Sequence, residues 1–256
     1  MTAALSRLNF RDLGGLPAAD GRFVRHGAIY RSEGPASFFE EHRAELAELD
    51  IRLICDLRAE VERAAAPNDW SPSGRVLNME ISNDLRVAAN EGWAALRHDP
   101  SEAGAIGAMT TNYGAMPGAL QPHVGALIQA IVDGEIPALI HCTAGKDRTG
   151  VLIGLLLALL GVAQQDIVGD YLRSDIFAKN LRLGGSISHA FEETFGFTPS
   201  EATIDAMIGV YPAYLAAAFA SVRQGWGNVE NYFTDAGVNA AQRQRFRDCL
   251  LTDKLK

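Results

Sequence analysis

Short apolar runs alternate with longer stretches of helical periodicity through the first two thirds of the chain. The run at 51–57 is almost wholly apolar, which is typical of a strand buried in a parallel sheet, and a shorter run at 138–141 has the same character. The expected strands cover residues 21–30, 51–57, 75–81 and 138–141. Strands in this order, with helical segments between them, indicate a mainly parallel sheet.

Helical periodicity dominates after the last of these strands. One earlier helix is expected over 37–49, and another over 113–132 that Pro117 and Pro122 should interrupt early. An almost wholly apolar helix follows at 151–162, and we interpret it as a core helix because roughly a dozen residues are too few to span a bilayer. Further helices are expected over 164–179, 200–208, 212–223 and 240–251.

These elements predict one α/β domain over residues 1–256. It should have a central, mainly parallel sheet flanked by helices and a helical C-terminal layer. Functional residues then gather at the carboxyl ends of the strands. The segment 84–110 has weak periodicity and contains several Ala and Gly, so it is either a helical lid over the site or a surface insertion.

Composition narrows the class of protein. The chain has 256 residues, 48% of them hydrophobic and 21% charged, which is ordinary for a globular domain with a substantial core. A net charge of −8 argues against nucleic acid as a partner, since such binding relies on a basic surface. Three cysteines make no disulfide framework, and the first residues carry no secretory signal, so we expect a cytoplasmic location. Export by a route without a signal peptide stays open.

One polar loop joins the strand at 138–141 to the apolar helix. Five residues separate Cys142 from Arg148, a spacing that suits a loop wrapped around a tetrahedral anion. Backbone N–H groups converge inside such a loop, and the following helix adds its positive N-terminal end. The same field favours the thiolate of Cys142, and the planar guanidinium of Arg148 can grip two phosphate oxygens. We therefore expect displacement at phosphorus through a phosphocysteine intermediate.

Other interpretations of this loop fit less well. A nucleotide-binding P-loop requires a glycine where Ile140 stands and a Ser or Thr where Asp147 stands. A zinc site requires clustered ligands, whereas the three cysteines lie at positions 55, 142 and 249. We expect no metal and no organic cofactor. The remaining structural alternative is that Cys142 is an inert core cysteine.

The motif His-Cys, five residues, Arg-Thr resembles the signature of the cysteine-dependent protein tyrosine phosphatase superfamily. The run from Gly145 to Gly150, Gly-Lys-Asp-Arg-Thr-Gly, resembles the loop of an atypical bacterial tyrosine-phosphatase family within it. Further similarity covers 9–15, 30–32, 56–58, 171–172 and 228–233, and is weakest between Asp84 and Thr110. The resemblance implies hydrolysis of phosphotyrosine, with phosphoinositides and phosphoserine or phosphothreonine as further candidate substrates.

The loop residues have distinct expected roles. Cys142 is the nucleophile and Arg148 stabilises the charge of the transition state. The candidate substrate-binding residues are Thr143, Ala144, Gly145, Lys146 and Thr149. Thr149 either donates its hydroxyl to the leaving sulfur or caps the helix. His141 either orients the loop as a neutral side chain or tunes the nucleophile.

Two further roles rest on the resemblance. Lys146 at the loop rim either contacts a second phosphate, as the family's phosphoinositide activity implies, or is a solvated lysine paired with a carboxylate. The chain has no Trp-Pro-Asp sequence to supply a general acid, so Asp147, which the family resemblance favours, is the leading candidate. Asp56 and Asp84 are rivals, although Asp56 could instead hold the loop or Arg58.

Several alternatives stay open at this point. Cys55 is either a redox partner of Cys142 or a buried core cysteine. The whole protein could be a catalytically idle phosphate-binding module, or a phosphatase of small metabolites. The sequence leaves its oligomeric state open.

Overall fold

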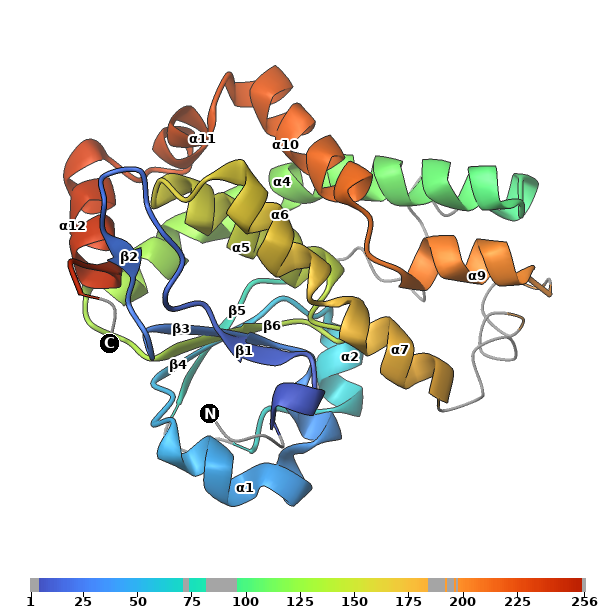
Figure 1. Ribbon diagram of the computed structural model, residues 1–256, viewed down its shortest axis with the longest axis horizontal. Helices are drawn as coiled ribbons and strands as arrows, with labels where there is room; N and C mark the ends of the chain where they lie inside the picture. Colours follow the sequence, from blue (N-terminus) through green and yellow to red (C-terminus); the bar gives the residue numbers. More distant parts are fainter. Residues whose placement is uncertain are drawn as a thin grey trace.

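The computed structural model describes residues 5–70, 74–81, 96–183, 192, 196 and 198–254. Its centre is a five-stranded sheet in the order β1-β3-β6-β4-β5 (Figure 1). The strands are β1 (Phe10–Asp12), β3 (Ile29–Ser32), β4 (Leu53–Asp56), β5 (Arg75–Asn78) and β6 (Ala138–His141). All neighbours are parallel except β1, which runs antiparallel to β3. The mainly parallel sheet expected from the sequence is confirmed.

Parallel pairing aligns the carboxyl ends of the three central strands. His141, the last residue of β6, lies opposite Ser32 of β3 and Asp56 of β4. A loop that leaves β6 therefore starts between the ends of two neighbouring strands. This is the edge at which α/β sheets usually hold their ligands.

The single strand expected over 21–30 is wrong. The structure has β2 (Phe23–Val24), which pairs with β7 (Leu251–Thr252) in a separate two-stranded sheet, and β3, which begins at Ile29. A turn divides them, and Gly27 within it has a φ of +70°. Extended backbone does not pass through that conformation, which glycine adopts at little cost.

Helices cover both faces of the sheet. In Figure 1, α1 (Phe39–Glu48) lies below the sheet, whereas α5 (Asp147–Leu159) and α6 (Gln164–Leu172) cover the opposite face. Alternation along β4 accounts for this arrangement. Ile54 joins the smaller apolar cluster on the α1 side, and its neighbour Leu53 joins the larger core. Because both faces are buried, the strand has the continuous apolar sequence noted above.

The two prolines do not interrupt helix α4 (Glu102–Val132). The helix expected over 113–132 is present as part of α4, which begins at Glu102 and runs for 31 residues, but the early interruption expected at Pro117 and Pro122 is wrong. Each proline removes one backbone hydrogen bond. The long apolar face that α4 buries offsets this loss.

The expected lid segment, 84–110, is described only in part. Residues 84–95 lie outside the described residues, and 102–110 form the first turns of α4. The lid therefore stays a prediction. The candidate acid Asp84 also lies outside the described part of the chain.

The C-terminal layer is helical, as expected. It contains α6, α7 (Asp175–Leu183), α9 (Glu201–Ile208), α10 (Pro212–Trp226), α11 (Val229–Asp235) and α12 (Ala240–Leu250). The one helix expected over 164–179 is divided near Ser174, whose buried hydroxyl accepts hydrogen bonds from Arg11 and Arg31. The sequence did not predict α11.

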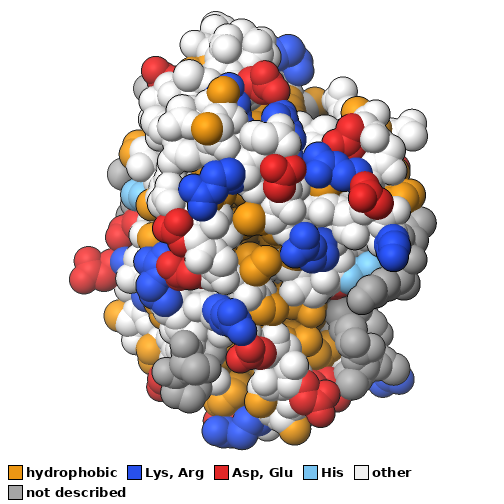
Figure 2. Space-filling view, turned by 90° about the vertical axis from the view of Figure 1, so that its left-hand side faces the viewer, with side chains coloured by type: hydrophobic (Ala, Val, Ile, Leu, Met, Phe, Trp, Pro, Cys, Tyr) orange, Lys and Arg blue, Asp and Glu red, His pale blue; other side chains and the backbone are white. Residues whose placement is uncertain are grey.

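The face that carries α12 and β2 interleaves acidic and basic side chains (Figure 2). Two of its ion pairs are Arg22–Asp20 and Arg247–Glu230, each at 2.8 Å. This face therefore presents no extended field of one sign. Among the helices within the described residues, none alone is both long and apolar enough to cross a bilayer, although α9 and α10 together, across a 48° bend, would meet that criterion.

Candidate active site

The loop from Cys142 to Lys146 connects β6 to α5 at the carboxyl edge of the sheet. The side chain of Cys142 is buried, and its Sγ accepts the N–H of Gly145 at 3.2 Å. Gly145 has a φ of +64°, and a Cβ there would lie 2.3 Å from the carbonyl oxygen of Ser32. The tight turn around the sulfur therefore requires glycine at this position.

Three consecutive loop carbonyls are held on the outside of the loop. Since a trans peptide directs its N–H away from its C=O, the N–H groups that follow them face inward. The Gly145 N–H that reaches the sulfur is one of these groups. The three contacts are Gly34 N–H to Thr143 O at 2.9 Å, Asn9 Nδ2 to Ala144 O at 2.8 Å, and Arg31 Nη2 to Gly145 O at 2.8 Å. The result is a cradle of inward donors that suits an anion.

Asn9 and Arg31 are fixed by a buried ionic cluster. Arg11 Nε and Arg31 Nη1 each lie 2.6 Å from one oxygen of Asp170, and Arg11 also donates to Asn9 Oδ1 at 2.9 Å. Burial alone would raise the pKa of Asp170, but the charges of Arg31 and Arg11 outweigh it and lower the pKa. Asn9, Arg11 and Arg31 fall within the segments of motif similarity, where Arg11 is expected to brace the fold, whereas Asp170 lies outside those segments. The structure gives them a physical task, which is to hold the loop from outside.

Arg148 is held by a carboxylate that sequence reasoning missed. Glu62, in the short helix α2 (Glu60–Ala65), accepts Arg148 Nη1 at 2.5 Å and Nη2 at 2.9 Å. It also accepts the Ala59 N–H at 2.9 Å and the Thr143 hydroxyl. Glu62 stands in a charged segment typical of a surface helix, so no pattern in the sequence distinguished it. The fork of Arg148 is therefore fixed in orientation beside the loop.

Asp56 and Arg58 form a buried pair below the loop. Arg58 donates to Asp56 through Nη2 at 2.8 Å and through its backbone N–H at 3.0 Å, and Asn68 Nδ2 donates at 2.7 Å. Burial alone would raise the pKa of Asp56, but the hydrogen bonds and charge of Arg58 outweigh it and lower the pKa. A fully buried and ion-paired carboxylate favours the bracing role over proton donation.

His141 and Cys55 have the properties of core residues. Burial lowers the pKa of His141 to about 4, so its ring is neutral at pH 7, and Nδ1 lies 3.3 Å from the carbonyl of Cys142. Burial raises the pKa of the Cys55 thiol, whose Sγ lies 3.0 Å from Met79 Sδ. Both observations favour the structural alternatives for these two side chains.

Lys146 and Asp147 are paired at the start of α5. Their Nζ and Oδ1 atoms lie 2.8 Å apart, and Lys146 also donates to the carbonyls of Met207 and Gly209, each at 3.2 Å, at the C-terminal end of α9. The negative end of that helix suits an ammonium group. Because Lys146 is only 4% exposed, it is not the solvated lysine considered from the sequence. Its contact with a second phosphate stays a prediction.

Thr149 lies within the first turn of α5 and does not cap it. The N-cap position is Lys146, which makes no side-chain capping bond. The Thr149 hydroxyl is fully buried and has no hydrogen-bond partner within the described part of the chain. An unpaired buried hydroxyl beside the loop is costly, which fits a group used during the reaction.

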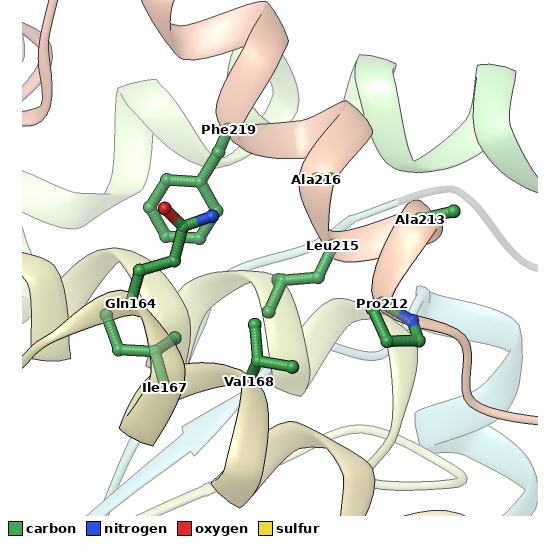
Figure 3. A pocket seen from close by; sticks show the side chains of 8 residues that line it. All are labelled: Gln164, Ile167, Val168, Pro212, Ala213, Leu215, Ala216 and Phe219. Carbon is green, nitrogen blue, oxygen red and sulfur yellow. The ribbon is translucent and has the colours of Figure 1, made fainter.

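Apolar space also occurs away from the loop. A cavity of about 210 Å³ lies between α6 and α10, where Ile167 and Val168 face Leu215 and Phe219 (Figure 3). None of its lining residues belongs to the loop. In the described segments, no three His, Cys, Asp or Glu side chains gather at a distance that could hold a metal ion.

The sequence of this chain is similar to those of known phosphatases. A family model described as the tyrosine phosphatase family matches residues 4–252. The chain is 33% identical to a putative tyrosine-protein phosphatase of Cupriavidus necator, over 91% of this chain and 83% of that protein. It is 30% identical to the triple specificity protein phosphatase PtpB of Mycobacterium tuberculosis, over 95% and 96% respectively. A tyrosine-protein phosphatase of Nostoc commune is 28% identical, over 90% and 76%.

Proposed function

The chain belongs to the tyrosine phosphatase family and is a phosphoric monoester hydrolase, and on that premise we propose that it hydrolyses phosphotyrosine through a phosphocysteine on Cys142. Phosphoinositides and phosphoserine or phosphothreonine are further proposed substrates. The breadth is supported by a relative of 30% identity whose name states a triple specificity.

The observation that carries this proposal is the sulfur at the base of a cradle of backbone donors. Cys142 Sγ already accepts one of the inward N–H groups, and the guanidinium of Arg148 is oriented beside it by Glu62. A phosphate in the cradle would have its phosphorus directly in front of a nucleophile whose negative charge the same donors stabilise. A module that only bound phosphate would have no use for the thiolate.

In the first step, the thiolate of Cys142 forms an S–P bond as the P–O ester bond breaks. The departing oxygen takes a proton from Asp147, which keeps about a quarter of its surface exposed, at 26%. Arg148 and the backbone N–H groups hold the three other phosphate oxygens, on which charge accumulates in the transition state.

In the second step, water attacks phosphorus and the S–P bond breaks. Asp147, now a carboxylate, takes a proton from that water, and orthophosphate leaves. The hydroxyl of Thr149 donates to the departing sulfur, which returns as thiolate. Both steps need a reduced cysteine, so we place the reaction in the cytoplasm, where the three free thiols of this chain stay reduced.

A substrate panel tests the proposed function. Phosphotyrosine peptides, phosphoserine peptides, phosphoinositides and soluble sugar or nucleotide phosphates are compared, with a metal chelator present. We expect phosphotyrosine peptides to have the highest kcat/KM and the Cys142→Ser variant to bind them without turnover. A higher kcat/KM for a soluble metabolite would indicate a small-metabolite phosphatase instead. No turnover of any ester would indicate a catalytically idle phosphate-binding module.

The role of Asp147 has its own test. Asp147→Asn keeps the size of the side chain and removes the proton, so we expect a loss of about 10²–10⁴-fold for phosphotyrosine and little loss for an aryl phosphate with an acidic phenol. Asp175→Asn is the matched control, because Asp175 also opens a helix and pairs with a lysine, Lys179. Equal losses on both substrates would indicate that Asp147 positions the loop and would move the acid role to Asp84, because Asp56 is buried and ion-paired with Arg58.

A further inference from the structure

A buried tyrosine of α4 reaches the carboxylate of Asp147. Tyr113 stands in the middle of that helix, is 0% exposed, and places its hydroxyl 2.5 Å from Asp147 Oδ1. No local pattern indicates this contact, because Tyr113 lies 34 residues before Asp147 on a separate element.

The two donors to Asp147 meet the same oxygen. Tyr113 donates to Oδ1, and Lys146 Nζ also lies 2.8 Å from Oδ1. Across the described ranges, no hydrogen bond falls on Oδ2. A carboxyl group clamped at one oxygen carries its transferable proton on the other, so the two contacts decide which oxygen can serve the leaving group.

Tyr113 is suited to act as a fixed donor. Burial, together with the charge of Asp147, raises its pKa well above the usual value, so it keeps its proton at every working pH. Its ring packs against Tyr171 at 6.2 Å and Tyr214 at 5.5 Å between centroids, which fixes the side chain. Its oxygen also lies 2.7 Å from the Tyr171 hydroxyl, so a short chain of hydrogen bonds supports the donor.

The last glycine of the loop motif, Gly150, leaves space for the tyrosines that form these hydrogen bonds. A Cβ at Gly150 would lie 2.8 Å from Cδ2 of Tyr171, so only glycine admits that ring beside α5. Gly150 therefore allows Tyr171 to lie where its hydroxyl contacts Tyr113, and Tyr113 in turn donates to the carboxylate of Asp147.

We propose that Tyr113 is a positioning residue for proton transfer, which holds Asp147 by Oδ1 so that Oδ2 faces the departing oxygen. This inference rests on the proposed role of Asp147 as the general acid. Without the Tyr113 bond, Lys146 alone would hold Oδ1, and the carboxyl group would rotate among more orientations, of which only some reach the leaving group. Misplacement of this kind slows proton transfer but leaves the attack of the sulfur intact.

The test is Tyr113→Phe, which removes one oxygen and keeps the ring. We expect kcat for phosphotyrosine to fall by roughly 10- to 10²-fold and kcat for an aryl phosphate with an acidic phenol to change by less than about threefold. Tyr232→Phe is the matched control, because it removes another buried hydroxyl bonded to the same helix, at the carbonyl of Pro117. It should leave both rates unchanged, and the urea midpoints of the two variants should be similar.

A double variant separates positioning from other roles. In an Asp147→Asn background there is no proton to position, so Tyr113→Phe should add no further leaving-group effect. The inference would be overturned if Tyr113→Phe caused its full loss of phosphotyrosine turnover in the Asp147→Asn background as well. It would also be overturned if Tyr113→Phe alone slowed both substrates equally. If Asp147→Asn itself shows no leaving-group selectivity, the proposed acid fails, and that result is obtained without touching Tyr113.

A substitution of Asp147 tests the same hydrogen bond from its acceptor. Asp147→Glu keeps an acid but displaces its carboxyl group by one methylene, so the present contact of Oδ1 with the Tyr113 hydroxyl is not kept in the same geometry. We expect it to lose about as much on phosphotyrosine as Tyr113→Phe does. Full activity of Asp147→Glu would show that a held orientation is unnecessary and would contradict the inference.

Discussion

Neutralising Glu62 should cost both stability and catalysis, because this buried carboxylate holds the guanidinium beside the loop. The perturbation is Glu62→Gln, which keeps the size of the side chain. It replaces one acceptor oxygen with an NH₂ group that would meet the N–H donors of Arg148, which the carboxylate accepts at 2.5 and 2.9 Å. The amide cannot satisfy both donors, and the charge that compensates the buried arginine is lost.

The magnitude follows from the proton affinity of the carboxyl group. Burial alone would raise the pKa of Glu62, but the hydrogen bond and charge of Arg148 outweigh it and lower the pKa from 4.5 to about 2. At about 1.4 kcal/mol for each pKa unit, ionised Glu62 stabilises the fold by up to about 3 kcal/mol at neutral pH. Since the folded pKa is the lower one, this stabilisation is complete above the unfolded value and is lost as the pH falls from 4.5 towards 2.

Urea unfolding of both proteins at pH 7 and at pH 3.5 measures this effect. We expect Glu62→Gln to be less stable by about 2–3 kcal/mol at pH 7, and the difference to shrink by about 1 kcal/mol at the lower pH. kcat/KM for phosphotyrosine should fall by at least roughly tenfold, because Arg148 loses its fixed orientation. The control Glu230→Gln removes an exposed carboxylate paired with Arg247 and should change stability by less than about 1 kcal/mol. An equal difference at both pH values would refute the reasoning.

Three other substitutions follow from the geometry of the loop. Gly145→Ala should abolish most activity and cost about 1–3 kcal/mol in urea unfolding, because φ is +64° and the new Cβ would meet the carbonyl of Ser32; wild-type activity would contradict this. Lys146→Ala should impair phosphoinositide hydrolysis more than phosphotyrosine hydrolysis if the ammonium contacts a second phosphate, whereas equal losses would assign it to holding Asp147. Asp170→Asn leaves two buried guanidinium groups poorly compensated and should lower the unfolding free energy by about 3–5 kcal/mol, with a change below about 1 kcal/mol arguing against the cluster.

The sequence predicts those parts of the structure that local patterns encode. The apolar run at 51–57 correctly predicts the buried strand β4. The Cys142–Arg148 spacing correctly predicts a loop in which a backbone N–H faces the sulfur. These features depend on neighbours in the chain, so a pattern over a few residues carries them.

Contacts between distant segments could not be predicted in the same way. Glu62 lies in a segment that is charged like any surface helix, and only the fold brings it to Arg148. Tyr113 matches the periodicity of a core helix, and nothing local indicates that its hydroxyl reaches the loop. Pro117 and Pro122 predict a break in the helix, but the buried packing of α4 keeps it continuous. In each example, a tertiary contact decides what the local signal leaves open.

The central claim is that the phosphoryl group passes through the sulfur of Cys142, and trapping the intermediate tests it most directly. Enzyme mixed with a labelled phosphotyrosine peptide is quenched in denaturant within one turnover, and the labelled residue is identified by mass spectrometry. With a labelled aryl phosphate of an acidic phenol, whose departure needs little acid, Asp147→Asn should increase the trapped fraction, because water loses its base in the second step. We expect the phosphate on Cys142, and none on the Cys142→Ser variant. Phosphate on any other residue, or turnover without a phosphoenzyme, would contradict the account.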